Sequence, residues 1–286
     1  MTACPRLRWT AAGDGFEAAD QPGHVRIVDS WLVAEGWVLA FEAHAQRFSA
    51  ACAELFGIAT EQTREFMHAA AARLPAEGRW FPRAELALAA GTPRLQLWLR
   101  PAPPPGRTVR LWLPAVPDAR TCPRIKGPDL DWLARQRKAA VAAGADEAVL
   151  VSRAGRVVEG STTSILWWRD DQLCAPGEGA SVLPGITRSV LLKAAAASGV
   201  PVVFSSPVPG ELAGLEVWTV NALHGIRPVT GWVGADIEPG PALRAARWQR
   251  YLDEIAAPIR SNHAKIRNEH GKELADVGSA VPEPQA

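Results

Sequence analysis

Hydrophobic and polar residues alternate in the first third of the chain, as is typical of half-buried β-strands. In VRIVDSWLVAEGWVLAFEAH, which begins at Val25, the alternation surrounds Glu35-Gly36 and predicts a β-hairpin. From His44 the hydrophobic positions change to helical spacing, and this helix is predicted to end at Gly57. A second helical segment, TEQTREFMHAAAARLP, follows. PRLQLWLRP and RTVRLWLPA then return to strand alternation and are joined by the proline-rich turn APPPG.

These elements predict two domains and an α/β (α+β) fold class. Residues 1–114 form a smaller N-terminal α/β domain, and the three prolines of PAVPDARTCP predict an interdomain linker over residues 115–123. A larger C-terminal domain is predicted over residues 124–260, and residues 261–286 are polar and predict a disordered tail.

Several elements of the larger domain are clear from their patterns. A helix is predicted from Asp131 to Ala143, followed by the strands EAVLVS and VVEG. SILWWRDDQLCAP predicts a hairpin, ITRSVLLKAAAASG an apolar helix, and PALRAARWQRYLDEIAA a C-terminal helix. In the first of these helices the buried face is expected to contain Leu133, Ala134, Arg137 and Val141.

Composition narrows the classes of function. The net charge is +1 and there is no basic run, so no nucleic-acid partner is expected. No apolar stretch reaches the roughly 18 to 20 residues of a membrane helix, and the N-terminus lacks the hydrophobic region of a signal peptide, so we expect a cytoplasmic protein without membrane association. The four cysteines are far apart and have no CxxC spacing, which predicts reduced thiols and no metal site.

Candidate chemistry is concentrated between Arg124 and Ser164. Lys126 lies in a loop marked by glycine and proline directly after the linker, and Glu159 lies at the end of a predicted strand. Loops at the ends of regular elements often contain functional side chains. The segment therefore offers one amine and one carboxylate at such positions.

The segments KGPDLDWLARQ, GADEAVLV and VVEGSTTSIL resemble the central signature of the class IV aminotransferase family. Further similarity is found in FEAHAQRFSAACAELFGI, VLPGITRSVLL and VNALHGIRPV, so that the resemblance covers residues from about 25 to 235. The family has the two-domain pyridoxal-phosphate (PLP) fold type IV, as in D-amino-acid aminotransferases. The resemblance therefore implies this fold, pyridoxal 5'-phosphate as the cofactor at the domain interface, and a homodimer.

The resemblance also implies roles for individual residues. Lys126 would hold the cofactor as a Schiff base and act in catalysis, and Glu159 would bond the pyridine nitrogen. A guanidinium fork and a helix N-terminus both suit a phosphate. The phosphate contacts implied in this way are Arg47, Gly185, Ile186, Thr187, Asn221 and Ala222.

Within the family, Asn221-Ala222-Leu223 resembles the lyase subgroup more than the threonine-containing turns of transaminases. The chain also has only one tyrosine, whereas transaminases tend to have one shortly after the lysine. We therefore expect a 4-amino-4-deoxychorismate lyase of folate biosynthesis, which yields 4-aminobenzoate and pyruvate. The arginines predicted to bind this small-molecule carboxylate substrate are Arg100, Arg124 and Arg227.

Two alternatives stay open. One is an aminotransferase that acts on branched-chain or D-amino acids with the same Lys126, Glu159 and Arg47. The other is a non-catalytic relative that keeps the fold, because KGPDLD differs from the KxxxNY and KxLNRL patterns of active members.

Overall fold

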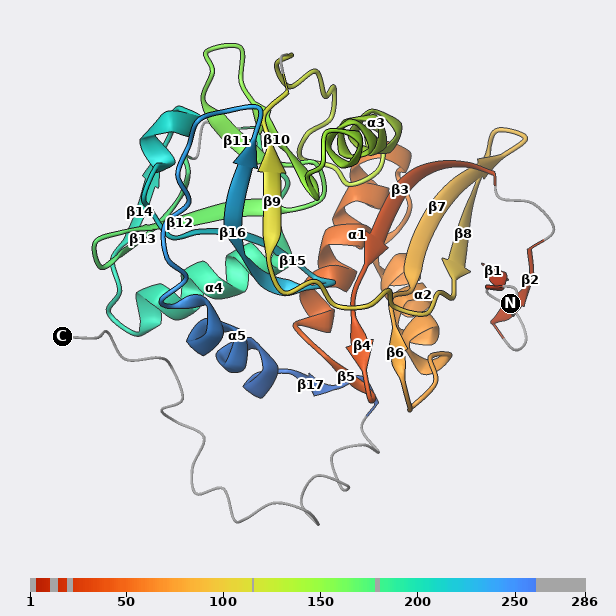
Figure 1. The fold of residues 1–286 in the computed structure, drawn as a ribbon. Helices are drawn as coiled ribbons and strands as arrows, with labels where there is room; N and C mark the ends of the chain where they lie inside the picture. Colours follow the sequence, from red (N-terminus) through yellow and green to blue (C-terminus); the bar gives the residue numbers. More distant parts are fainter. Residues whose placement is uncertain (1–3, 11–14, 20–22, 115, 178–180, 261–286) are drawn as a thin grey trace, which may run out of the picture. The chain divides into compact units, whose positions relative to one another are not determined.

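The computed structural model describes residues 4–10, 15–19, 23–114, 116–177 and 181–260 (Figure 1). Their contacts define two compact units. The first contains the described residues of Met1–Pro104, Ile125–Pro128 and Ile255–Gly278, and the second those of Pro105–Arg124 and Asp129–Glu254. The predicted tail, residues 261–286, lies outside the described residues.

The first unit is built on a five-stranded antiparallel sheet in the order β2-β1-β8-β7-β3. The helices α1 and α2 share one hydrophobic core with this sheet, to which Phe48, Phe66 and Leu86 contribute. A smaller four-stranded sheet has the order β17-β5-β4-β6. The elements of this unit are β1 (Arg6–Trp9), β2 (Phe16–Ala18), β3 (His24–Ser30), β4 (Val33–Ala34), β5 (Trp37–Val38), α1 (Phe41–Phe56), α2 (Thr60–Ala72), β6 (Arg79–Trp80), β7 (Arg83–Ala89), β8 (Thr92–Trp98) and β17 (Ala257–Pro258).

Local predictions in this unit are confirmed where turn chemistry decides the structure. The hairpin at Glu35-Gly36 is β4–β5, in which Val33 pairs with Val38. Both turn residues have positive φ, 49° and 78°, as a tight two-residue hairpin turn requires. The helix α1 ends at Gly57, whose φ is 64° and whose N–H donates to the carbonyl of Ala53.

The second unit contains an eight-stranded mixed sheet in the order β11-β10-β9-β16-β15-β12-β13-β14. Its strands are β9 (Val109–Trp112), β10 (Glu147–Val151), β11 (Val157–Gly160), β12 (Ser164–Arg169), β13 (Gln172–Pro176), β14 (Val202–Ser205), β15 (Val217–Asn221) and β16 (Gly225–Val233). Its helices are α3 (Leu130–Ala142), α4 (Ile186–Ala197), the 3-10 helix η1 (Pro209–Leu212) and α5 (Ala245–Glu254).

Strand β9 corrects one expectation about how the strands are grouped. It was assigned to the smaller domain, but it pairs in parallel with β10 and β16 in the sheet of the second unit. The segment between β8 and β9 contains Pro101 and Pro103–Pro105, which have no N–H for a strand ladder. The chain therefore leaves the first sheet at these prolines, and the compact units divide between Pro104 and Pro105. The other domain limits stay a prediction.

The predicted buried face of α3 is wrong. Of its residues only Ala140 is fully buried, while Ala134 and Arg137 are exposed and Val141 is 59% exposed. Ala140 packs with Ala145 and Ala148 against Trp112 and Val233. The helix thus contacts its unit through small alanine side chains.

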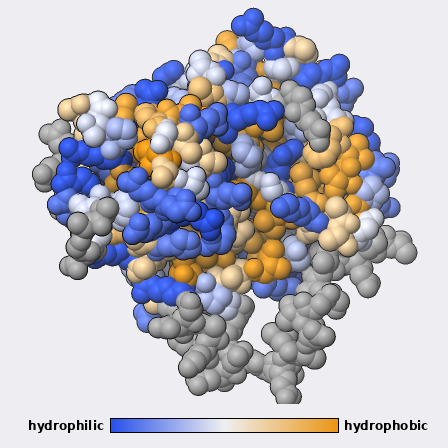
Figure 2. All heavy atoms as spheres, turned by 180° about the vertical axis from the view of Figure 1, so that it is seen from behind, coloured by the Kyte–Doolittle hydropathy of each residue, from blue (hydrophilic) through white to orange (hydrophobic). Residues whose placement is uncertain are grey.

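On the face drawn in Figure 2, hydrophilic residues cover much of the surface and hydrophobic residues gather in separate patches between them. Large hydrophobic side chains that are exposed include Val141, Phe204 and Leu243. Among the described residues, no helix has both the length and the apolar character needed to cross a membrane.

Candidate active site

Lys126 is attached to the first unit through its backbone. Its carbonyl oxygen accepts a hydrogen bond from the N–H of Val28 at 2.8 Å. Strand β3 is at the edge of its sheet, so the lysine segment satisfies a donor that the sheet leaves unpaired. A Cβ atom at Gly127 would lie 2.0 Å from the carbonyl oxygen of Arg26, so only glycine permits this close approach.

Arg47 lies on α1 and is held by Asp29, a fully buried residue of β3. Its Nε donates to Oδ2 at 2.8 Å and its Nη2 to Oδ1 at 2.9 Å, while Nδ1 of His44 lies 2.7 Å from Oδ1. Burial by itself would raise the pKa of Asp29, but Arg47 and His44 outweigh it and hold this pKa well below the usual range. Asp29 therefore stays ionised and fixes the guanidinium of Arg47.

Three consecutive residues of β3 thus hold three predicted site residues. Val28 binds the backbone of Lys126, Asp29 binds Arg47, and the hydroxyl of Ser30 accepts from Nη2 of Arg100 at 3.3 Å. Burial, followed by repulsion from Arg83, lowers the pKa of Arg100 to about 10. Within the first unit, Lys126, Arg47 and Arg100 are therefore each held by a residue of the same strand, β3.

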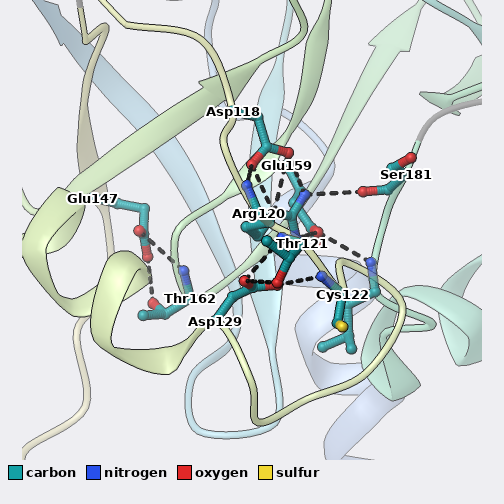
Figure 3. A network of polar contacts seen from close by, with 10 residues as sticks. Asp118, Arg120, Thr121, Cys122, Asp129, Glu147, Glu159, Thr162 and Ser181 are labelled. Atoms are coloured by element: carbon teal, nitrogen blue, oxygen red, sulfur yellow. Dashed lines mark hydrogen bonds and ion pairs between the residues drawn. The ribbon is translucent and has the colours of Figure 1, made fainter.

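In the second unit, Glu159 lies at the end of β11 and is held by Arg120 (Figure 3). Nη1 of Arg120 and the backbone N–H of Leu183 (3.0 Å) both donate to Oε1 of Glu159. The side chains of Arg120 and Glu159 are 4% and 5% exposed. Burial raises the pKa of Glu159, and the positive charge of Arg120 opposes this rise.

The turn that follows Glu159 is shaped by Glu147, which is fully buried at the start of β10. Glu147 accepts hydrogen bonds from the hydroxyls of Ser161 and Thr162 and from the N–H of Thr162 at 3.2 Å. A Cβ at Gly160 would lie 2.2 Å from Oγ1 of Thr163. Glycine at 160 and a carboxylate at 147 are therefore both needed for this conformation.

The segment before α4 provides an anion-binding geometry. Gly185 is the N-cap, and a Cβ there would lie 2.6 Å from Oγ of Ser164. The first N–H groups of a helix have no acceptor within it. Thr187 in this first turn is 2% exposed, and its Oγ1 meets no hydrogen-bond partner among the described residues.

Asn221 shapes the turn between β15 and β16. Its Oδ1 accepts from the N–H groups of Leu223 at 3.1 Å and His224 at 2.9 Å, and its Nδ2 donates to the carbonyl of Thr162 at 3.4 Å. The second unit thereby joins the Asn221–Ala222 turn to the Glu159 turn. The phosphate contact expected of Asn221 and Ala222 stays a prediction.

The remaining predicted arginines are not part of these two groups of contacts. Arg227 on β16 is 8% exposed, and burial lowers its pKa. A Cβ at Gly106 would approach its Cδ and Nη1 at 3.4 Å. Arg124 is exposed, and no polar side-chain contact of it is found in the described part of the chain.

Four acids that bind neighbouring groups within the two units were given no role by the sequence prediction: Asp29, Asp118, Asp129 and Glu147. Asp129 accepts from the N–H and hydroxyl of Thr121 and from the N–H of Cys122, at 2.8 to 3.0 Å. For Asp29 the sequence contains one indirect signal. Its two partners, His44 and Arg47, are three residues apart and therefore lie on the same face of a helix, where a single acid can contact both. Glu147 also stands out as an acid at the start of an apolar strand.

The residues of the second unit fit pyridoxal phosphate. Glu159 offers a carboxylate to a ring nitrogen, and the α4 N-terminus together with the buried hydroxyl of Thr187 suits an anionic phosphate. The hydroxyl of Thr163, also buried, has no partner among the described residues. Lys126 and Arg47, for which the resemblance also implies cofactor contacts, belong to the first unit.

Comparison with known proteins identifies the family. The family model described as amino-transferase class IV matches residues 26–232. The chain belongs to the class IV aminotransferase family. Membership of this family supports the predicted fold type IV, the pyridoxal 5'-phosphate cofactor and a PLP-dependent enzyme, aminotransferase or lyase.

Individual relatives are more distant. A probable branched-chain-amino-acid aminotransferase of Synechocystis sp. is 39% identical over 62 residues, which are 22% of this chain and 20% of that protein. The fold is similar to that of the branched-chain amino acid aminotransferase from Escherichia coli, with a TM-score of 0.74 and 16% identity over 90% of this chain and 100% of that chain. It is also similar to a putative 4-amino-4-deoxychorismate lyase from Legionella pneumophila, with a TM-score of 0.68 and 18% identity over 81% of this chain and 91% of that one.

Proposed function

We propose that this protein is a PLP-dependent 4-amino-4-deoxychorismate lyase that forms 4-aminobenzoate and pyruvate. The observation that supports the lyase is the turn at Asn221. This asparagine accepts two backbone hydrogen bonds within its turn and donates one to the turn after Glu159. The resemblance implies a threonine-containing turn at this place in transaminases, whereas this chain has Asn221-Ala222-Leu223.

The chemistry assigns separate tasks to the two units. Bound PLP supplies a ring that accepts electrons from the substrate. The amine of Lys126 removes the proton from the carbon of the substrate ring that bears the amino nitrogen. The C–O bond to the enolpyruvyl group then breaks, and a proton returned to that group by Lys126 releases it as pyruvate. The remaining ring becomes aromatic, so the residues mainly have to hold reactants in place.

Binding of the reactants is assigned as follows. Glu159 holds the ring nitrogen, while Arg47 and the α4 N-terminus with Thr187 hold the phosphate. Arg100 is the first choice for a substrate carboxylate, because Ser30 holds it on the same strand as the residues that fix Lys126 and Arg47. Arg227 and Arg124 are the remaining candidates. A cytoplasmic homodimer completes the proposal, and light scattering of the purified protein tests the dimer.

The decisive experiment is incubation of the purified protein with PLP and 4-amino-4-deoxychorismate. We expect 4-aminobenzoate and pyruvate in equal amounts, no product from Lys126→Ala, and normal product from Lys138→Ala, which changes an exposed lysine of α3. The proposal is wrong if the protein forms no 4-aminobenzoate but transfers nitrogen between an amino acid and 2-oxoglutarate. A protein that binds no PLP would instead support the non-catalytic relative.

An aminotransferase that acts on branched-chain or D-amino acids is the second candidate. The match to a probable branched-chain-amino-acid aminotransferase favours it, although that match covers only 22% of this chain. A plain amino acid would then convert bound PLP to its amine form, which a spectrum in the near ultraviolet detects. The same preparation serves both assays.

A further inference from the structure

Arg120 is the one arginine that the structure attaches directly to Glu159 within the described residues, and it was not predicted to have a role. It follows the predicted linker proline Pro117 and is buried, with a side chain 4% exposed. Such a guanidinium must be satisfied by its neighbours, because an unpaired buried charge is costly. The hydrogen bonds that Arg120 makes with its neighbours therefore determine which of its nitrogens binds Glu159.

Asp118 fixes Arg120 before Arg120 reaches Glu159. The carboxylate of Asp118 accepts from Nε at 3.0 and 3.1 Å and from Nη2 at 2.8 Å, and Nη2 also donates to the carbonyl of Ser181 at 2.9 Å. Asp118 is itself held by the carbonyl of Val151 on β10, which accepts its N–H at 2.7 Å. These bonds leave Nη1 to donate to Glu159 (Figure 3).

The two oxygens of Glu159 are used differently. Arg120 and the N–H of Leu183 both donate to Oε1, and no donor among the described residues meets Oε2. One carboxylate oxygen is therefore fixed by the protein, and the other is left for a ligand donor. Arg120 also has to serve two carboxylates, Asp118 and Glu159, so the three groups together carry one negative charge.

We propose that Arg120 is a positioning residue for the cofactor: it occupies Oε1 of Glu159 and thereby presents Oε2 to the protonated ring nitrogen. The inference rests on the PLP-dependent function proposed above and adds a residue to it. The negative charge of the Asp118–Arg120–Glu159 group matches the positive charge of the protonated nitrogen. Glu159 also acts on Arg188 of α4, where burial lowers the pKa of the guanidinium and the charge of Glu159 opposes this change.

The group also determines the ionisation of Glu159. Burial and Asp118 raise the pKa of Glu159, whereas Arg120 and the N–H of Leu183 lower it. Removing Arg120 would leave only the N–H of Leu183 to oppose burial, so Glu159 would take up its proton at higher pH. A neutral Glu159 no longer keeps the ring nitrogen protonated.

The test compares Arg120→Met with Arg120→Lys, which keeps the charge but not the fork, and with Arg153→Met, which changes an exposed arginine. PLP affinity of the full-length protein is measured by equilibrium dialysis, and the infrared carboxyl band is titrated in the protein without PLP. We expect Arg120→Met to bind PLP at least about tenfold more weakly and to show a protonated carboxyl band about one pH unit higher than the parent. The protonated carboxyl band should disappear in Arg120→Met/Glu159→Gln. Arg120→Lys should bring the titration of the band closer to that of the parent than it brings the PLP affinity. Arg153→Met should match the parent in both measurements.

Folded Arg120→Met with parental affinity and titration would overturn the inference. If Arg120→Met does not fold, the triple variant Asp118→Asn/Arg120→Met/Glu159→Gln decides, because removing all three charges of the group should restore folding. Failure of the triple variant to fold counts against the pairing. The proposed lyase fails separately, when the parent binds PLP but makes no 4-aminobenzoate.

Discussion

The buried acid that holds Arg47 allows a quantitative prediction. In Asp29→Asn the side chain keeps its size but loses the charge that pairs with Arg47 and His44. Breaking one partner of a buried ion pair costs about 3 to 5 kcal/mol, and because asparagine keeps one oxygen acceptor we expect about 3 kcal/mol. For a chain of this size that lowers the melting temperature by about 6 to 12 °C.

The dependence on pH provides a second measurement of the same interaction. The pKa of Asp29 in the folded protein lies below its usual value near 4, so its contribution to stability is complete above about pH 4 and is lost as the pH falls further. The difference in free energy of unfolding between the parent and Asp29→Asn should therefore be constant around pH 6 to 7 and shrink below about pH 4.

Urea unfolding at several pH values measures both effects. Asp236→Asn, which changes an exposed aspartate, should differ from the parent by no more than about 0.5 kcal/mol. If Asp29→Asn is as stable as the parent at pH 7, or if the difference in free energy of unfolding grows as the pH falls, then the ion pair does not stabilise the folded protein. PLP affinity should fall together with stability, because Asp29 fixes the guanidinium proposed to bind the phosphate.

Two further substitutions test the turn after Glu159. Glu147→Gln should lower the free energy of unfolding by about 2 kcal/mol, because two hydroxyls and two N–H groups lose a charged acceptor. Glu238→Gln on the surface should not change the urea midpoint. Gly160→Ala places a Cβ 2.2 Å from Oγ1 of Thr163 and should cost about 1 to 3 kcal/mol in the same assay. Thr163→Ala in that background should recover part of the loss, and an unchanged midpoint in Gly160→Ala would show that the turn is not tightly packed.

Local patterns predicted most of the elements because neighbouring residues decide them. The turn at Glu35-Gly36 and the end of α1 at Gly57 follow from backbone conformations that these residues adopt easily. Strand β9 was placed in the wrong group because its partners are remote: Val109 pairs with Val229, and Leu111 with Glu147. A pattern of hydrophobic residues identifies a strand but not the strand beside it.

The proposed binding residues illustrate the same difference. Lys126, Glu159 and Thr187 could be named because each lies in a short segment that resembles the family. The residues that hold such groups could not, because Asp29 is 18 residues from Arg47, and Arg120 is 39 from Glu159. An isolated acid is usually a solvated surface group, so only the fold shows that these acids are buried and paired.

Residues that hold the proposed cofactor-binding groups cannot by themselves identify the reaction. Asp29, Asp118 and Glu147 hold groups that are proposed to bind the cofactor or lie beside it, and a lyase and an aminotransferase both need the cofactor bound. Evidence for the reaction must therefore come from residues whose identity alters what the substrate meets. We propose Asn221 as such a residue: its side-chain oxygen accepts from the N–H groups of Leu223 and His224 and thereby fixes the turn without a threonine hydroxyl. The case for a lyase consequently depends on this turn, whereas the case for PLP depends on Glu159, Thr187 and the acids and arginines around them.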